Sequence, residues 1–442
     1  MAYYILKSYK LKAEPLEIFS VLSRERNCFF LDSSLNRSPS LARYSFLGVD
    51  PFFIFKTDNK EPFTRLRSAL EEYRIPPGKN RPPFLGGAVG YFTYEAECLF
   101  GFYNTVITID HLKGNLYIFS AGFPEKKTHW QKQLSESNFR KIERLLAKVL
   151  PGAGGCAENP PGAHIQLQSN FSKEGYLTAV QKAKEYIRKG DIYQVNLSQQ
   201  FHGRSPSSAP DIYRRLRKIN PSAFGAYFDA GGFQILSSSP ERFLKLKGSL
   251  VTTRPMKGTR PRSRDKLKDR RLRQELLKSA KDRAELMMIV DLERNDLGRV
   301  CSYSSVRVHK LRELEEYSTV FQTTATITGQ LHKDKDRFDL LRASFPGGSI
   351  TGCPKIRAME IIEELEPSRR CLYTGALGYL SFSGDMEFNI LIRTLLKKQG
   401  KIYFGSGGGI VADSNPEEEY EETLVKARGL MQAITNSKKW RE

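Results

Sequence analysis

Two glutamates near the C-terminus have the spacing of a cation site. Asn415 and Pro416 are typical of a helix start, because asparagine caps free N–H groups and proline suits the first helical position. Glu419 and Glu422 are three residues apart and therefore share one face of the predicted helix. Two carboxylates on one face suit Mg²⁺ as ligands. Acids in a first turn also compensate the helix dipole, so the pattern alone leaves both interpretations open.

A second acid pair, Asp282-x-x-Glu285, precedes the apolar run LMMIV. This spacing is that of a capping box, in which side chains satisfy the backbone N–H groups at a helix start. The alternative is that Glu285 meets the terminal-helix pair across a cleft and completes a magnesium site. The spacing does not choose between the two interpretations.

Lys257 stands in the stretch RPMKGTRPR, close to Arg254, Arg260 and Arg262. Neighbouring positive charge and burial both lower the pKa of a lysine, and a neutral amine is a nucleophile. The plainer interpretation is a solvated loop lysine. Glu241, in the segment SPERF, is either a surface acid or, if burial raises its pKa, a general acid.

Two glycine-rich segments are candidate anion sites. GSGGGI (405–410) follows the apolar strand KIYF, and a glycine run lets backbone N–H groups approach an anion closely. The plainer interpretation is a flexible turn. The run GSGGGI does not fit a GxGxxG motif at a helix start, which disfavours a dinucleotide site. FPGGSITGCPKIRAM (345–359) is a second loop, and it leads into a helix whose N-terminus can hold negative charge.

Strands and helices arrive in blocks along the chain, with hairpin-like strand pairs, which favours an α+β fold over a parallel arrangement. Apolar spacing and capping residues predict helices at 65–75, 135–150, 172–190, about 268–298, 355–366 and 415–434. Short apolar runs predict strands at 28–35, 44–55, 88–94, 115–123, 193–201, 222–230, 233–238, 242–247, 375–382 and 390–398. The Gly/Pro-rich segment 151–164 is the predicted linker between an N-terminal region, 1–150, and a catalytic region, 165–442.

The composition limits the classes of protein that fit. The chain has 442 residues and a formal charge of +21, but its lysines and arginines are spread along the whole sequence without a nucleic-acid-binding motif. No run approaches the ~20 apolar residues of a membrane span, and the N-terminus does not resemble a signal peptide. The six scattered cysteines are expected to be free thiols in a reducing cytoplasm. We expect neither nucleic acid nor membrane as a partner.

Taken in order, the motifs resemble the chorismate-utilising enzymes, which include anthranilate, aminodeoxychorismate, isochorismate and salicylate synthases. The resemblance extends over about 170–434 and rests on GDIYQVNLSQ, SSSPERFL, RPMKGTRPR, DRAELMMIVDLERNDLGRVC, FPGGSITGCPKIRAMEII, YTGALGYLSFSGDMEFNILIRT and GSGGGIVADSNPEEEYEET. The N-terminal region matches more loosely through FLDSS, ARYSFLGVDP and GGAVGYFTYE. FLDSS resembles the start of the tryptophan-inhibition site of anthranilate synthases.

The resemblance implies a central antiparallel β-sandwich with helices outside, and Mg²⁺ that holds the ring carboxylate of chorismate. It implies metal-site acids at Glu285, Glu419 and Glu422. The substrate-binding positions that it implies are Gln194, Thr259, Ser349, Tyr373, Arg393, Gly407, Gly408, Gly409 and Lys426. A dianionic substrate among several glutamates needs a divalent cation and an arginine in order to bind.

Two positions sort this chain within the family. Members that add water have a lysine base where this chain has Gln194, so ammonia is the expected nucleophile. Anthranilate synthases resemble this chain but have alanine at position 257, whereas lysine is typical of aminodeoxychorismate synthases. In that mechanism the lysine adds to C2 of chorismate as the C4 hydroxyl leaves with help from Glu241, and ammonia then adds at C4 and expels the lysine.

We therefore expect amination of chorismate at C4 to 4-amino-4-deoxychorismate, the precursor of p-aminobenzoate and folate. Anthranilate synthesis is the alternative. Gln322 stands where many members have a histidine associated with pyruvate elimination, which fits an enzyme that stops at aminodeoxychorismate. Cys353 replaces a usual alanine. The sequence contains no glutaminase-like segment, so a separate glutaminase subunit is the expected source of ammonia.

Overall fold

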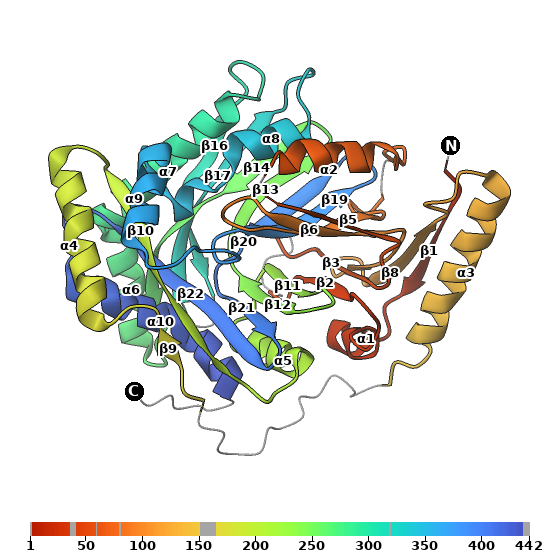
Figure 1. The fold of residues 1–442 in the computed structure, drawn as a ribbon, viewed down its shortest axis with the longest axis horizontal. Helices are drawn as coiled ribbons and strands as arrows, with labels where there is room; N and C mark the ends of the chain where they lie inside the picture. Colours follow the sequence, from red (N-terminus) through yellow and green to blue (C-terminus); the bar gives the residue numbers. More distant parts are fainter. Residues whose placement is uncertain are drawn as a thin grey trace.

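Two large antiparallel sheets pack face to face, and helices cover their outer surfaces (Figure 1). This computed structural model describes residues 2–35, 41–58, 60–78, 81–150, 165–317 and 320–435. The predicted linker, 151–164, lies outside the described residues. The predicted α+β class, with a central antiparallel sandwich and helices outside, is confirmed.

The first sheet, called sheet A, contains the long strands that border the candidate site. Its strands, in spatial order, are β1 (Tyr4–Lys10), β8 (Asn115–Ala121), β7 (Thr105–Asp110), β3 (Tyr44–Gly48), β2 (Phe29–Asp32), β11 (Phe224–Asp229), β12 (Gln234–Ser239), β21 (Thr394–Lys398), β22 (Lys401–Ile410), β10 (Gln194–Arg204) and β18 (Gly352–Cys353), and β9 (Gln168–Ser169) also pairs with β10.

The second sheet, called sheet B, holds the strand that carries Lys257 at one end. Its strands, in spatial order, are β15 (Met256–Pro261), β17 (Val320–Gln330), β14 (Leu250–Arg254), β13 (Arg242–Lys247), β20 (Met386–Ile390), β19 (Ala376–Ser381), β5 (Gly87–Phe92), β6 (Cys98–Tyr103) and β4 (Phe53–Thr57), and β16 (Arg307–Glu316) also pairs with β17.

Segments from before and after residues 151–164 share both sheets. In sheet A, β2 pairs with β11, so that Phe30 lies opposite Tyr227. In sheet B, β5 pairs with β19, so that Tyr91 lies opposite Leu377. Each sheet is therefore continuous across the two regions of the sequence.

Aromatic side chains fill the space between the two sheets. Phe46 of sheet A meets Tyr379 of sheet B with ring centroids 5.4 Å apart, and Phe29 meets Phe84, which precedes β5, at 6.2 Å. These residues are buried together with small and branched side chains of both sheets. Alternation along each strand sends the other side chains to the outer faces, which the helices cover.

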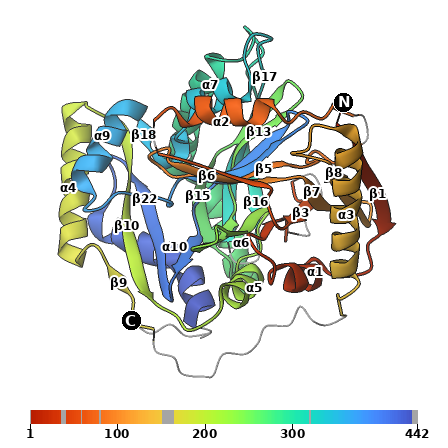
Figure 2. The same cartoon turned by 45° about the vertical axis from the view of Figure 1, so that its right-hand side comes forward.

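Helices pack on both outer faces. Sheet A is covered by α1 (Pro15–Leu22), α3 (Thr128–Leu146), α5 (Ala209–Ile219) and α10 (Pro416–Thr435), while α4 (Lys173–Lys189) and α9 (Lys355–Leu365) pack at its β10 end (Figure 2). Sheet B is covered by α2 (Pro62–Glu71), α7 (Ala280–Gly298) and α8 (Arg337–Ser344), and α6 (Lys266–Lys278) contacts β15 and β17. A short 3-10 turn, η1, spans Gly348–Ile350.

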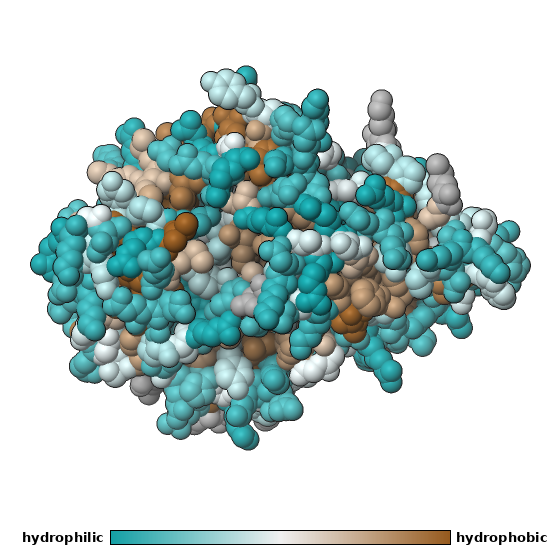
Figure 3. Space-filling model, turned by 45° about the horizontal axis from the view of Figure 1, so that its top comes forward, coloured by the Kyte–Doolittle hydropathy of each residue, from teal (hydrophilic) through white to brown (hydrophobic). Residues whose placement is uncertain are grey.

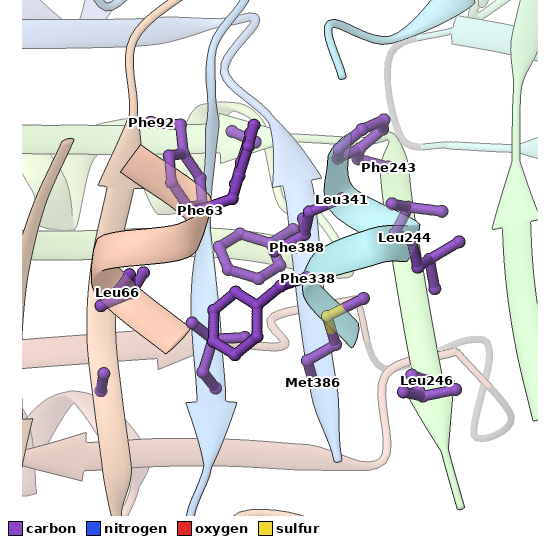
Figure 4. Packing of buried hydrophobic residues seen from close by; sticks show 14 of the residues in the cluster. Phe63, Leu66, Phe92, Phe243, Leu244, Leu246, Phe338, Leu341, Met386 and Phe388 are labelled. Atoms are coloured by element: carbon purple, nitrogen blue, oxygen red, sulfur yellow. The ribbon is translucent and has the colours of Figure 1, made fainter. Parts of the chain in front are cut away.

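The packing on sheet B shows how these elements are fixed. Phe63 of α2 and Phe338 of α8 pack onto the sheet beside Phe92 and Phe388 (Figure 4). The rings of Phe63 and Phe92 lie 5.0 Å apart. Large aromatic side chains contribute most of the buried apolar area here, so they hold both helices on the sheet.

Several predicted elements are confirmed and two are corrected. Ser172 caps α4 through the N–H of Gly175, and Gly190 ends that helix in the left-handed conformation. The helix predicted at 268–298 is two helices, because the extended backbone of Ser279 ends α6 and caps α7. The glycine run 405–410 is not a turn but the second half of strand β22. Sequence spacing missed the short helices α1, α5 and α8.

The face in Figure 3 is mainly hydrophilic, with scattered apolar areas. None of the helices in the described ranges is long and apolar enough to cross a membrane. The five cysteines within those ranges are free thiols.

Candidate active site

A cavity of about 330 Å³ lies where the ends of the two sheets meet, between β15, β22, α7 and α10. It collects residues that are more than 200 positions apart in the sequence, because each sheet edge presents one wall.

Lys257 enters the cavity from β15. The β15–β17 register shifts between Lys257 and Thr259, and Gly258 between them has φ of 74°, a conformation that suits glycine. This bulge redirects the side chains on either side of it. A Cβ at Gly258 would also lie 2.8 Å from Leu276 of α6, so glycine is required here for two reasons.

The environment of Lys257 differs in part from the one expected. Removal of the amine from water lowers its pKa, the charge of Glu285 opposes that shift, and the charge of Lys426 adds to it. The expected role of the sequence-adjacent arginines is wrong. Arg254 pairs with Glu313 and Glu315, Arg260 pairs with Asp282 and Arg262 pairs with Asp269, so acids neutralise all three arginines.

Glu241 faces the cavity from the connection between β12 and β13. It is buried, and burial raises its pKa to about 7, while the hydroxyl of Ser349 and the charge of Lys257 limit the rise. A carboxyl group with this pKa is half protonated near neutral pH and can donate a proton.

The Ser349 segment forms the wall beside Glu241. Ser349 and Ile350 of η1 line the cavity, whereas α9 contributes no lining residue. The anion site expected at the N-terminus of α9 is therefore not part of the cavity. Buried Arg370 fixes this wall, because it donates to the carbonyl of Ile350 at 2.7 Å and to that of Asn196 at 2.8 Å.

The glycines of β22 make room for the side chains around them. A Cβ at Gly405 would lie 2.3 Å from the ring of Tyr373. A Cβ at Gly409 would lie 2.1 Å from Nε2 of Gln194 and 3.3 Å from Nζ of Lys257. Gly407 pairs with Ser198 of β10, so its backbone groups belong to the sheet. The glycine run thus acts as the floor of the cavity rather than as a loop around an anion.

Three glutamates border the cavity on the α7–α10 side. Glu285 comes from α7, and Glu419 and Glu422 come from the first two turns of α10, whose N-cap is Asn415, as predicted. A Cβ at Gly408 would lie 3.3 Å from Oε2 of Glu419 and 3.4 Å from Oε1 of Glu422, so these two carboxylates converge on one point of the floor.

Two lysines balance these acids. Lys426 lies 2.6 Å from Glu422 and lowers the pKa of that carboxyl, and it also donates to the carbonyl of Gly407 at 3.0 Å. Lys281 lies 3.6 Å from Glu419. Burial raises the pKa of Glu419 and of Glu285. Within the described ranges, no three acidic, histidine or cysteine side chains are already gathered closely enough to form a metal cluster.

The capping box predicted for Asp282 and Glu285 does not form. Ser279 caps α7 instead, and its hydroxyl accepts from the N–H of Asp282 at 3.1 Å. The carboxylate of Asp282 pairs with Arg260 at 3.0 Å. Because the helix begins three residues earlier than predicted, Glu285 is free of capping and lies at the cavity.

Arg393 and Tyr373 line the opposite part of the cavity. Arg393 precedes β21, and no carboxylate pairs with its guanidinium among the described residues. Burial lowers its pKa. A half-buried arginine without an acidic partner is suited to bind an anion, because the ligand would then supply the missing countercharge.

Two glutamine carbonyls near Lys257 lack a hydrogen-bond donor. Gln194 and Gln322 are both buried, and the Oε1 atom of each has no partner. Nε2 of Gln322 donates to Oγ1 of Thr259 at 3.1 Å, so the orientation of this amide is fixed. Buried amide oxygens without partners are suited to accept from a ligand with N–H or O–H groups.

The structure brings the predicted site residues together with few exceptions. Those that line the cavity are Lys257, Glu241, Thr259, Ser349, Tyr373, Arg393, Gly407, Gly409, Lys426, Glu285, Glu419 and Glu422. Gln194 lies behind Gly409, and Gly408 faces the acids. Sequence reasoning missed the polar lining residues Asn196 and Lys281. Asn196 follows Gln194 by two positions on one strand, and that spacing was the available signal for it.

Comparison with known proteins agrees with this arrangement. A family model described as chorismate binding enzyme matches residues 26–432. The chain is 37% identical to anthranilate synthase component 1 of Acetivibrio thermocellus, over 95% of this chain and 92% of that protein. It is 36% identical to aminodeoxychorismate synthase component 1 of Bacillus subtilis, over 89% of each chain.

Solved structures show the same fold. The crystal structure of anthranilate synthase component I from Streptococcus pneumoniae superposes with a TM-score of 0.78 at 31% identity, over 88% of this chain and 92% of that chain. The menaquinone-specific isochorismate synthase MenF of Escherichia coli superposes with a TM-score of 0.76 at 20% identity, over 98% of this chain and 95% of that chain.

Proposed function

Because this chain belongs to the family of chorismate binding enzymes, we propose that it aminates chorismate at C4 with ammonia and forms 4-amino-4-deoxychorismate. The observation that carries the proposal is the position of Lys257. Its amine lies in the cavity, its pKa is lowered by burial, and Glu241 faces the same space.

The proposed chemistry uses Lys257 as the first nucleophile. The neutral amine adds to C2 of chorismate, both ring double bonds shift, and the bond from C4 to its hydroxyl breaks. Glu241 supplies the proton with which the hydroxyl leaves as water, which its pKa of about 7 allows. Ammonia then adds at C4, both double bonds shift back, and the amine of Lys257 leaves C2. The lysine is regenerated and no oxidant is needed.

Gln194 supports ammonia as the second nucleophile. An amide does not deprotonate water at neutral pH, so this position provides no base for hydroxylation. The carbonyl of the buried Gln194 lacks a donor, and ammonia has three N–H groups that can supply one. The amide also lies beside Lys257 across Gly409, so ammonia held there is close to the proposed adduct.

Mg²⁺ is the proposed cofactor, with Glu285, Glu419 and Glu422 as the residues that would hold it. Carboxylate oxygens are the ligands that Mg²⁺ prefers, and it commonly uses one or two of them together with water and substrate oxygens. The convergence of Glu419 and Glu422 on Gly408 fits such a set. When bound, the ion would neutralise a substrate carboxylate and polarise it. Arg393 would bind the other carboxylate of the substrate.

The proposed partner is a glutaminase subunit that supplies ammonia. The relatives from Acetivibrio thermocellus and Bacillus subtilis are both named component 1, which supports a two-component enzyme. Free ammonia is scarce at neutral pH, because most of it is protonated, so a dedicated source would raise its concentration at the cavity.

Anthranilate synthesis is the second candidate, because relatives of that name are as similar to this chain as the aminodeoxychorismate synthase is. The presence of lysine rather than alanine at position 257 favours amination at C4. The two candidates differ in their product, so one assay separates them.

The test is to incubate the protein with chorismate, Mg²⁺ and ammonium chloride, and to add a separate aminodeoxychorismate lyase. We expect p-aminobenzoate that depends on the lyase. Anthranilate formed without the lyase would overturn the proposal, and isochorismate formed without ammonium would do so in favour of hydroxylation. Omission of the protein controls for spontaneous breakdown of chorismate.

A further inference from the structure

Glu293 is a buried acid behind the cavity that the proposed reaction does not use. It lies on α7, two turns beyond Glu285, and only 8% of its surface is exposed. Its Oε2 atom lies 2.8 Å from Oγ1 of Thr253 in β14. No lysine or arginine forms an ion pair with it in the described part of the chain. An ionised carboxylate would be unfavourable in this position.

The hydroxyl of Thr253 indicates which partner carries the hydrogen. Oγ1 of Thr253 also lies 2.7 Å from the carbonyl oxygen of Phe243, and a carbonyl can only accept. One hydroxyl hydrogen cannot be donated at full strength to two acceptors. If it goes to Phe243, the contact with Glu293 is a full hydrogen bond only when the carboxyl group of Glu293 is the donor, that is, when Glu293 is protonated.

The charged groups around Glu293 are consistent with a neutral acid. Burial raises its pKa to about 8; the hydrogen bond of Thr253 opposes this rise, the nearby acids Glu241 and Asp296 add to it, and Lys355 opposes it. Lys355 is already engaged, because its ammonium group contacts Asp296 at 2.5 Å and two backbone carbonyls, of Ser344 at 3.0 Å and Pro346 at 2.9 Å. These contacts use its three donors.

Glu293 also supports the wall of the cavity. A Cβ at Gly348 would lie 3.5 Å from Cγ of Glu293 and 2.9 Å from Leu292, so α7 packs directly under this glycine. The next residue, Ser349, faces Glu241 in the cavity. The side chain of Glu293 thus fills the space behind the segment that contacts Glu241.

We propose that Glu293 is a positioning residue that acts through Glu241. As a neutral acid bonded to Thr253, it fills the space behind Gly348 without adding charge, and it keeps water away from Glu241. This inference rests on the proposed role of Glu241 as the acid that protonates the leaving hydroxyl. Loss of the Glu293 side chain would admit water, stabilise the ionised form of Glu241 and remove the proton that the reaction needs.

The first test compares Glu293→Ala with Glu293→Gln, and measures kcat against pH at saturating chorismate and a fixed concentration of free ammonia. We expect Glu293→Ala to move the midpoint of the alkaline limb down by about one pH unit, so that kcat at pH 7.5 falls about tenfold. Glu293→Gln fills the same space and donates an N–H to Thr253, so it should restore both values. Thermal unfolding of both variants identifies simple loss of the fold.

The outcomes separate the role of Glu293 from a merely structural one. A structural residue would lower the melting temperature without moving the pH midpoint. If Glu293→Gln lowers the midpoint as far as Glu293→Ala does, the acid carries a negative charge at neutral pH and the proposal is wrong. An unchanged midpoint in Glu293→Ala would also overturn it.

A second measurement does not depend on turnover. At pH 7, infrared spectra should contain the carbonyl stretch of protonated, buried carboxyl groups, to which half-protonated Glu241 also contributes. The band should persist in Glu241→Gln and be lost when Glu293→Gln is added to that variant, whereas Glu293→Gln alone should only weaken it. A spectrum unchanged by Glu293→Gln would refute the neutral acid. If that band is found but no aminodeoxychorismate forms, the proposed function fails and the protonation of Glu293 stands.

Discussion

The amide of Gln194 occupies the space that a side chain at Gly409 would need. A Cβ at position 409 would lie 2.1 Å from Nε2 of Gln194, well inside van der Waals contact. The two residues lie on neighbouring strands, β10 and β22, at the end nearest Lys257. Gly409 thus fixes the orientation of an amide that, in the proposed reaction, receives ammonia.

Gly409→Ala should therefore impair amination more than it impairs folding. The methyl group would displace the Gln194 amide from its place beside Lys257, and overpacking of this kind costs about 1–3 kcal/mol. We expect kcat/KM for ammonia to fall about tenfold or more, which corresponds to roughly 1.4 kcal/mol in the transition state. Steady-state kinetics with ammonium chloride would measure kcat/KM for ammonia. Gly232→Ala is the matched control, because a Cβ there meets nothing within 4 Å.

Glu241→Gln should abolish activity and stabilise the protein at alkaline pH. The pKa of Glu241 is raised to about 7 in the fold, above the ordinary value of 4.5, so the unfolded chain loses this proton first as pH rises. Its contribution to stability is complete below pH 4.5 and is lost as the pH rises to about 7, by about 3 kcal/mol. Glu241→Gln has no carboxyl group at this position, so it does not lose this stability as the pH rises. Its melting temperature at pH 8 should exceed that of the wild type, and an equal or lower value would contradict the buried, protonated carboxyl.

Arg393→Met should weaken substrate binding without weakening the fold. The arginine is half-buried without an acidic partner in the described part of the chain, and its partial removal from water lowers its pKa. A charge in this state destabilises the protein until an anion binds, so removal should leave the melting temperature unchanged or higher. We expect KM for chorismate to rise by roughly two orders of magnitude, because removal of one partner of a charged, hydrogen-bonded pair typically has an effect of this size. Arg294→Met, on the exposed side of α7, should leave KM unchanged, and an unchanged KM in Arg393→Met would refute the role.

Chelation with EDTA should abolish activity, and Mg²⁺ should restore it. Glu419→Gln and Glu422→Gln should each weaken cation binding by roughly tenfold or more, because each removes a carboxylate from a small ligand set. Binding of Mn²⁺, followed by electron paramagnetic resonance, measures this without turnover. Glu418→Gln is the control, because Glu418 is in the same helical turn but exposed. Equal Mn²⁺ affinity in all three variants would mean that Glu419 and Glu422 do not bind the cation and only stabilise the start of the helix.

Much of the fold follows from local patterns, because capping and apolar spacing act within a few residues. Ser172 and Gly190 mark the ends of α4, and Asn415 marks the start of α10, as the sequence predicts. The break at Ser279 was missed because the run of helix-forming residues continues through it, and only the packing of α6 and α7 against β15 selects two helices.

The candidate site depends more on contacts between distant segments. The glycines of β22 look like a loop in the sequence, since glycine disfavours strands, but Tyr373 and Gln194 fill the space that their missing side chains leave. The three arginines near Lys257 were expected to lower its pKa, yet each of them pairs with an acid: Arg254 with Glu313 and Glu315, Arg260 with Asp282, and Arg262 with Asp269. Glu293 gave no sequence signal, because nothing in DLERND distinguishes a buried glutamate from an exposed one.

The most direct test of the central claim is to look for the covalent adduct on Lys257. The protein is mixed with chorismate and Mg²⁺ without ammonia, quenched rapidly in acid, and analysed by intact and peptide mass spectrometry. We predict a mass increase equal to chorismate minus one water on the peptide that contains Lys257, which disappears when ammonium is added and is absent in Lys257→Ala. Formation of aminodeoxychorismate at the normal rate by Lys257→Ala, or without any adduct on Lys257 in the wild type, would contradict the account.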